Sequence, residues 1–185
     1  MYRAEVDGTN RKEIAKFSDA QVSATADYGE GYFVYTYRNT EDVEGNTLEQ
    51  CRAGIYLVDL KEEKTEQSAV YDGYQAYIPN VMVYNGKVYY VYSYLKEYMD
   101  FSNYEAIFTE EFNQKMMENI CFELWEYDIK TKEQSCIRKG GNYNSITMND
   151  GIICVRESDR ATIINCVDGV QKEVSPEVFC NKAVM

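Results

Sequence analysis

Histidine is absent from this 185-residue chain, which also has only two prolines and one tryptophan. Without an imidazole the chain cannot form a Ser-His-Asp or Cys-His nucleophile pair, or a His-ligated zinc or haem site. It also lacks a C-x-x-C pair, a G-x-S-x-G elbow and a phosphate-binding glycine loop. We therefore expect no catalytic residues, no metal site and no cofactor.

Long uncharged stretches are lacking as well, and none approaches the ~20 residues that a membrane-spanning helix needs. Acidic residues outnumber basic ones by 31 to 19, which gives a net charge of -12. Such a surface repels phosphate backbones and anionic headgroups, so we expect neither a nucleic-acid partner nor membrane insertion. Residues 1–6 contain no apolar core of the kind found in a signal peptide, so none is predicted in this chain.

Six cysteines are spread along the chain, at positions 51, 121, 136, 154, 166 and 180. Their even number permits three disulfides, but their spacing requires none. Cys136, Cys154 and Cys166 fall in stretches that we interpret as strands, where cysteine usually behaves as a small buried apolar residue.

The chain is rich in tyrosine, with eighteen residues, and two kinds of hairpin segment alternate along it. In the first kind, a strand and a polar turn lead to a second strand; it begins near residues 1, 55, 124 and 162. In the second kind, a glycine turn at Gly31, Gly86 or Gly151 precedes an apolar strand, rich in tyrosine at the first two. The Asp-Gly and Asn-Gly pairs predict type I′ turns, because both central residues of such a turn need a positive φ.

Four short antiparallel strands repeated in this order are typical of a propeller blade. We predict an all-β fold, a single domain over residues 1–185 with about 3.5 four-stranded antiparallel blades, partial or completed by oligomerisation, and one inserted helix. The predicted parts are a half blade at 1–20, blades at 21–74, 75–140 and 141–175, a helical insertion at 95–121 and a tail at 176–185.

The inserted helix is predicted over residues 103–118. Ser102 and Glu105 fit a capping box at its start. Apolar residues follow at helical spacing, so we expect this stripe to pack against the blades.

The segment MYRAEVDGTNRK at residues 1–12 resembles the repeat of YWTD-type, low-density-lipoprotein-receptor-like β-propellers, and GKVYY at 86–90 is similar to a strand of the same group. The resemblance implies a place among bacterial propellers of surface or secreted proteins, and thus an extracytoplasmic location. The chain departs from the family in having no intact Tyr-Trp-Thr-Asp tetrad. Rings of that family have about six blades, so a homodimer that completes a ring is one expectation.

One face of the predicted propeller gathers aromatic and acidic residues, because the connections between the second and third strands of each blade emerge there. Aromatics beside carboxylates suit a sugar or a peptide. The alternative is that the aromatics pack the inserted helix down. The candidate ligand-binding residues are Tyr37, Tyr94, Tyr98, Phe101, Tyr104, Glu97 and Asp100.

A second candidate is the acidic cluster of Glu41, Asp42, Glu44 and Glu49. Its oxygens could hold calcium, but the calcium-loop pattern is missing, and a solvated acidic loop is the favoured interpretation.

The leading functional hypothesis is a non-catalytic binding or scaffolding module of a bacterial surface or secreted protein, with a protein or glycan ligand. One alternative is a carboxylate-based hydrolase of glycan or peptide. Another is a purely structural fragment of a larger propeller.

Overall fold

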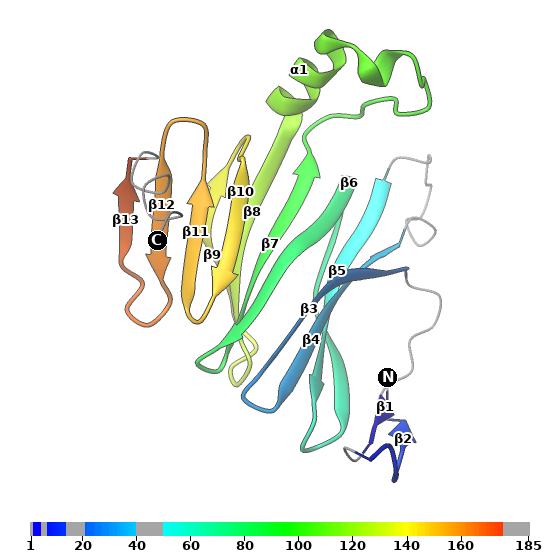
Figure 1. The fold of residues 1–185 in the computed structure, drawn as a ribbon, viewed down its shortest axis with the longest axis vertical. Helices are drawn as coiled ribbons and strands as arrows, with labels where there is room; N and C mark the ends of the chain where they lie inside the picture. The colour runs from blue at the N-terminus through cyan, green and yellow to red at the C-terminus, as the bar shows by residue number, and fades with distance from the viewer. Residues whose placement is uncertain (1, 5–6, 14–20, 40–49, 176–185) are drawn as a thin grey trace.

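The computed structural model describes residues 2–4, 7–13, 21–39 and 50–175 of the chain. Antiparallel strands dominate these residues, with one short 3-10 helix and one α-helix (Figure 1). A seven-stranded meander is formed by β3 (Gln21–Gly29), β4 (Tyr32–Asn39), β5 (Gln50–Asp59), β6 (Lys64–Tyr84), β7 (Lys87–Leu95), β8 (Ile120–Asp128) and β9 (Gln134–Gly140).

Two smaller sheets complete the described structure. A four-stranded sheet consists of β10 (Ser145–Asn149), β11 (Ile152–Arg156), β12 (Ala161–Asn165) and β13 (Gln171–Val174). A short hairpin consists of β1 (Tyr2–Arg3) and β2 (Lys12–Glu13). Within each sheet, every strand pairs with the next one along the chain.

Strand β6 is unusually long, with 21 residues, and belongs to two four-stranded units. Its first half pairs with β5, and its second half pairs with β7. The register shifts between Tyr74 and Tyr77 and again between Tyr77 and Asn80. Gln75, at this break, has a φ of +50°, so the strand bends where one unit passes into the next. The three units are thus β3–β6, β6–β9 and β10–β13.

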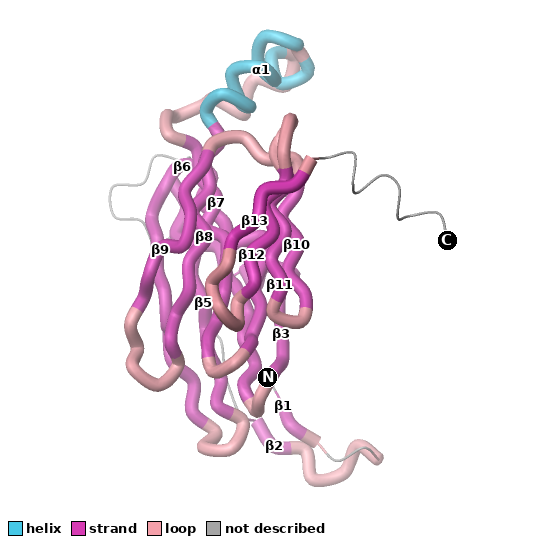
Figure 2. The backbone as a smooth tube through the Cα atoms, turned by 90° about the vertical axis from the view of Figure 1, so that its left-hand side faces the viewer, coloured by secondary structure: helices cyan, strands magenta, loops and turns pink. Residues whose placement is uncertain are grey.

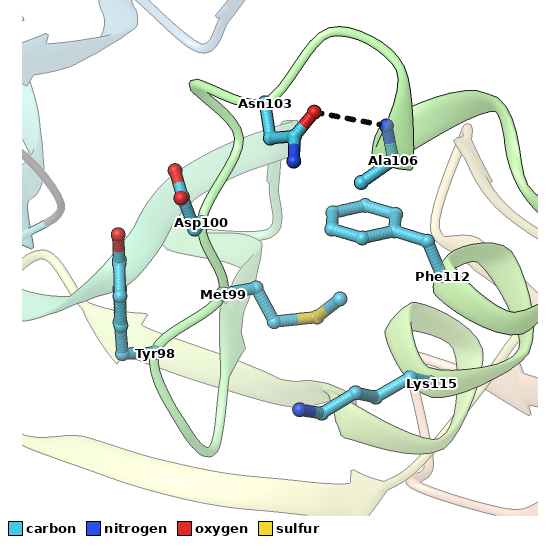
Figure 3. Close-up of a pocket in the computed structure, with 7 residues that line it drawn as sticks. All are labelled: Tyr98, Met99, Asp100, Asn103, Ala106, Phe112 and Lys115. Atoms are coloured by element: carbon cyan, nitrogen blue, oxygen red, sulfur yellow. Dashed lines mark hydrogen bonds between the residues drawn. The ribbon is translucent and has the colours of Figure 1, made fainter.

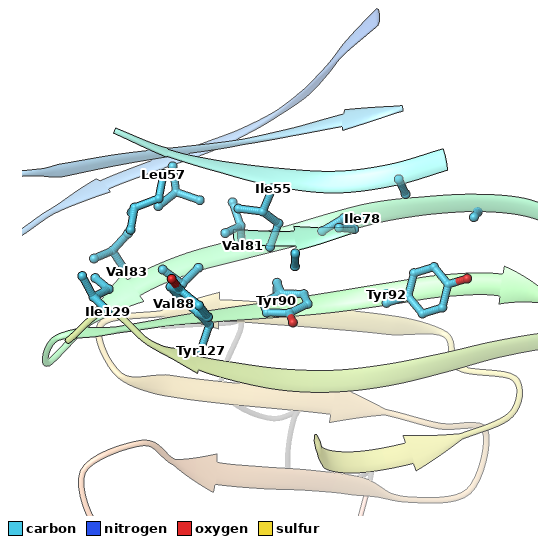
Figure 4. Packing of buried hydrophobic residues seen from close by; sticks show 14 of the residues in the cluster. Ile55, Leu57, Ile78, Val81, Val83, Val88, Tyr90, Tyr92, Tyr127 and Ile129 are labelled. Atoms are coloured by element: carbon cyan, nitrogen blue, oxygen red, sulfur yellow. The ribbon is translucent and has the colours of Figure 1, made fainter. Parts of the chain in front are cut away.

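The units are held together by two apolar cores. Figure 4 shows the core between the first and second units. Strand β7 shows how one strand serves both cores, because successive side chains point to opposite faces. Tyr90 and Tyr92 enter the core shared with the first unit, whereas Tyr89 and Val91 enter the core shared with the third unit. Both faces of the middle unit are therefore buried, which explains why the alternation of polar and apolar residues is lost in β7.

Glycine turns set the hairpins of the second and third units. Asn85 and Gly86 have φ values of 51° and 71°, and Asp150 and Gly151 have 45° and 74°. These pairs confirm the predicted turns with two positive φ angles. The same prediction is wrong for Asp168-Gly169, where only the glycine has a positive φ. There Asp168 Oδ1 accepts a hydrogen bond from the Val170 amide at 3.0 Å and supports a longer loop.

The inserted helix differs from the prediction in its start. Helix α1 covers Glu110–Asn119, and the 3-10 helix Ala106–Phe108 precedes it. Thr109 caps α1, since its hydroxyl accepts from the Phe112 amide at 3.2 Å. Ser102 does not cap a helix, because its hydroxyl donates to Asp100 at 2.6 Å.

The expected packing of this helix against the blades is also wrong. Helix α1 lies beyond the ends of β7 and β8 and covers neither face of the sheet (Figures 1 and 2). Asn119 is its one buried residue. The apolar residues of the helix therefore contribute little to the cores between the units.

The described cysteines, Cys51, Cys121, Cys136, Cys154 and Cys166, are free thiols. Cys136, Cys154 and Cys166 are half-buried rather than fully buried. Cys136 lies on β9 and Cys154 on β11 as predicted, whereas Cys166 follows the end of β12 in a turn, so its predicted place in a strand is wrong. Burial raises the pKa of each of these three thiols. The sixth cysteine, Cys180, lies outside the described residues.

Candidate functional site

A segment of 24 residues, 96–119, is inserted between β7 and β8 and forms a projection at one end of the sheet (Figure 2). Asn119 closes its base. The side-chain amide of Asn119 donates to the Glu97 carbonyl at 2.9 Å, and its side-chain oxygen accepts from the Glu97 amide at 2.9 Å. The Lys96 amide also donates to the Asn119 carbonyl at 3.1 Å. The two ends of the insertion are thus held next to each other.

Short-range hydrogen bonds shape the loop above this base. Asp100 Oδ1 accepts from both the amide and the hydroxyl of Ser102. Asn103 Oδ1 accepts from the amides of Glu105 and Ala106, both at 3.2 Å. Side chains of Asp and Asn make such turns readily, and here they lead the chain into the 3-10 helix.

A pocket of about 380 Å³ lies between this loop and α1 (Figure 3). Its volume is within the range of small-ligand sites, although it is open to solvent. Met99 is 4% exposed and supplies a buried apolar surface. We call this the insertion pocket; its lining residues are Tyr98, Met99, Asp100, Asn103, Ala106, Phe112 and Lys115.

Large apolar side chains stand exposed around the insertion pocket. Tyr104 and Phe108 are 74% and 72% exposed, and their rings meet edge to face at 5.5 Å. Phe101 meets Phe112 in the same manner at 5.3 Å. We call the exposed group the insertion patch; it consists of Tyr98, Phe101, Tyr104, Phe108 and Met117.

Four of the seven residues predicted from the sequence lie in or beside this pocket. Tyr98 and Asp100 line it. Phe101 contacts it through Phe112, and Tyr104 belongs to the exposed patch. Glu97 lies at the base of the insertion, where its backbone is held by Asn119 and its side chain is exposed.

Tyr37 and Tyr94 lie elsewhere. Tyr37 is buried on β4, where its ring lies against Gly54 and Tyr56 and its hydroxyl is hydrogen-bonded to Gln67. Burial, followed by the neighbouring Tyr56, raises the pKa of Tyr37. The ring therefore supports the sheet and is not available to a ligand.

Tyr94 is half-buried on β7 and stacks on Tyr92 at 4.8 Å. Its hydroxyl donates to Glu123 at 3.4 Å. Burial and then the negative charge of Glu123 raise the pKa of Tyr94. Tyr94 thus belongs to the contact between the first two units.

Sequence reasoning missed five residues of the pocket, Met99, Asn103, Ala106, Phe112 and Lys115. Phe112 and Lys115 are three residues apart on α1 and share one face of the helix, a spacing that could have identified them together. Asn103 could have been found as a turn residue. Nothing in the sequence distinguishes Met99 from an ordinary core methionine.

The insertion pocket combines one carboxylate, one ammonium group and apolar side chains. The hydroxyl and then the amide of Ser102 lower the pKa of Asp100, so its carboxylate is ionised at neutral pH and cannot act as a general acid there.

In the described part of the chain, no group of three or more Cys, Asp or Glu residues is placed to hold a metal ion. The helices of that part are all too short or too polar to span a membrane.

The acidic cluster at Glu41, Asp42, Glu44 and Glu49 lies outside the described residues. Its interpretation as a solvated loop or a calcium site stays a prediction.

The comparisons with known proteins concern the fold alone. No family model matches the chain, and no curated protein matches it in sequence. Among solved structures, the chain is similar to a mutant apocarotenoid oxygenase from Synechocystis, with a TM-score of 0.50 and 8% identity over 85% of this chain and 38% of that one. It is also similar to the β-propeller domain of the Trilobed protease from Pyrococcus furiosus, with a TM-score of 0.49 and 12% identity over 85% of this chain and 43% of that one.

A third similar structure is an oligogalacturonate lyase from Vibrio parahaemolyticus, with a TM-score of 0.37 and 7% identity over 94% of this chain and 59% of that one. The chain thus spans less than half of the first two structures and less than two thirds of the third. The four-stranded antiparallel units and the single inserted α-helix form a partial β-propeller, as the sequence predicted.

Proposed function

We propose that this chain is a non-catalytic binding module whose ligand, a protein segment or a glycan, docks on the insertion pocket and the surrounding patch. The observation that carries the proposal is the exposure of Tyr104 and Phe108 on an element that the sheets do not need for their cores. Exposed apolar groups beside a pocket are typical of interaction sites. The ionised Asp100 and the ammonium group of Lys115 would supply polar contacts that orient a ligand.

The test is a binding screen against peptide and glycan panels with two forms of the protein. In the control form, residues 97–118 are replaced by a two-residue turn, which the adjacent Lys96 and Asn119 backbones can accommodate. We expect this variant to fold, as judged by circular dichroism and urea unfolding, and to lose the ligand. Equal binding by both forms would place the ligand elsewhere and overturn the proposal.

A carboxylate-based hydrolase of glycan or peptide is the alternative of a different class. The described residues of the insertion pocket include one carboxylate, Asp100, whereas glycoside hydrolysis by the usual route needs a pair. Turnover of any member of the panels, abolished by Asp100→Asn without loss of binding, would replace the binding function by this one. A chain that binds nothing would leave the third hypothesis, a purely structural part of a larger propeller.

The finer family placement is part of the proposal. The segments at residues 1–12 and 86–90 support membership of the YWTD-type propellers, and with it a bacterial surface or secreted protein. A homodimer would complete the ring, and the outward face of the third unit, where Ile152 is half exposed, supports such a contact. Light scattering coupled to size-exclusion chromatography gives the molar mass; a strict monomer at high concentration would exclude the dimer.

A further inference from the structure

Exposed apolar surface is concentrated on the insertion. Among the described residues, half of the large apolar side chains that are exposed belong to the insertion patch. The rings of the pairs Tyr104–Phe108 and Phe101–Phe112 meet edge to face at 66° and 84°, so they do not form one flat platform. Apolar side chains of a partner can insert between such rings, as in the packing of an amphipathic helix into a groove.

The charge around this patch has one dominant sign. Residues 96–119 contain six carboxylates and two lysines, a net charge of -4, and all eight charged side chains are exposed. The carboxylates are those of Glu97, Asp100, Glu105, Glu110, Glu111 and Glu118. A ligand that covers the patch therefore meets apolar side chains that alternate along the chain with these exposed carboxylates, which we call the acidic rim.

This combination selects among the classes of ligand. A second copy of the chain would bring a further net charge of -12 against the acidic rim, so self-association through the patch is disfavoured. A neutral glycan could donate hydrogen bonds to single carboxylates, but it would gain nothing from the net negative charge of the rim. A protein segment with an apolar stripe and several lysines or arginines matches both parts of the surface.

We infer that the ligand of this site is a basic amphipathic segment of another protein. The inference rests on the proposed binding function and specifies its ligand class. The apolar stripe of the segment would pack on Tyr104, Phe108 and the open side of the insertion pocket. Its cationic side chains would face the carboxylates at the rim, above all Glu105 and Glu118, which follow Tyr104 and Met117 in the sequence.

The experiment titrates the full chain with three synthetic 18-residue peptides and measures binding by calorimetry. The first has a leucine and phenylalanine stripe with lysines on the other face. The second has the same stripe with glutamates in place of the lysines, and the third is a lysine peptide without the stripe. We expect the first to bind with a micromolar Kd, weakening several-fold between 50 and 300 mM salt because exposed charges are screened.

Variants then separate the two parts of the surface. Tyr104→Ala with Phe108→Ala should weaken the basic amphipathic peptide by about tenfold or more, as expected for central aromatic anchors. Tyr28→Ala is the matched control, because Tyr28 is 64% exposed on β3, outside the insertion. Glu105→Lys with Glu118→Lys should reduce the salt dependence and weaken binding by a similar factor.

Each outcome decides one claim. Preference for the basic amphipathic peptide, lost in both double variants and kept in Tyr28→Ala, supports the inference. Equal binding of the lysine peptide, unaffected by loss of the aromatics, would show non-specific attraction and overturn it. Binding of the acidic peptide or of a glycan, dependent on the aromatics, would overturn the inference and leave the proposed function standing. A patch that binds none of these probes would overturn both.

Discussion

Replacing Gly151 by alanine should destabilise the protein strongly, because two separate penalties coincide there. Gly151 has a φ of +74°, a conformation that costs an L-residue about 1–2 kcal/mol. A Cβ at this position would also lie 2.5 Å from Cε1 and Cζ of the Tyr84 ring. Tyr84 packs against the core between the second and third units, so it can give way only by losing packing. Such overpacking costs a further ~1–3 kcal/mol.

Gly169 offers a matched control for this prediction. Its φ is +71°, but an added Cβ would meet nothing within 4 Å. Gly169→Ala should therefore show the backbone penalty alone, about 1–2 kcal/mol. Gly151→Ala should cost about 2–5 kcal/mol, the sum of the backbone and overpacking penalties. Urea unfolding measures both free energies, with an unchanged m-value as the check that the transition itself is the same.

A double-mutant cycle with Tyr84→Ala isolates the contact between the ring and the added methyl group. With the ring removed, Gly151→Ala should cost no more than Gly169→Ala, because the backbone penalty alone remains. Equal costs for the two glycine variants in the wild-type background would refute the reasoning. So would a cost at Gly151 that persists after the ring is removed.

Two further predictions concern an ion pair and the helix cap. Arg52 donates two hydrogen bonds to Asp72 and lowers the pKa of its carboxyl group, so the pair stabilises the folded protein at neutral pH and this contribution is lost as the pH falls below about 4, through the pKa of the folded state. Asp72→Asn should therefore reduce the decrease of the urea midpoint with falling pH. A pH dependence equal to that of the wild type would contradict the assignment. Thr109→Ala should speed amide hydrogen exchange in residues 110–119 by about fivefold, because a lost helix cap costs ~1 kcal/mol, and it should leave the urea midpoint of the whole protein unchanged. A lower urea midpoint in this variant would mean that the helix is coupled to the sheets.

The hairpins were predictable because their turns carry local chemistry. Asn85-Gly86 and Asp150-Gly151 adopt two consecutive positive φ angles, and these residue types tolerate them. The continuous β6 was not predictable, because Pro79 lies inside it and proline usually ends a strand. It is tolerated where the ladder skips from Tyr77 to Asn80, at a register shift that the sequence does not reveal.

The candidate site was predictable in part for a similar reason. Tyr98, Asp100, Phe101 and Tyr104 lie close together because they share one short loop, so proximity follows from the chain itself. Whether Tyr94 lies near the loop or near the first unit depends on the face of β7 from which its side chain projects. A shift of one residue in register would move the side chain to the opposite face. Only the tertiary structure shows that this face meets the first unit.

The insertion separates what stabilises this protein from what it presents to solvent. The cores between the units are filled by residues of β4–β12, whereas the apolar residues of α1 stay exposed or half-buried. A large apolar side chain that stays in water forgoes about 1.5–3 kcal/mol of burial free energy. Tyr104 and Phe108 together therefore forgo several times the free energy that one helix cap contributes. Neither ring belongs to a core between the units, so the sheets gain no packing from them. A partner that covers these rings recovers that free energy on binding. It can do so without disturbing the cores, since the two ends of the insertion are held together at its base by hydrogen bonds of Asn119 and Lys96.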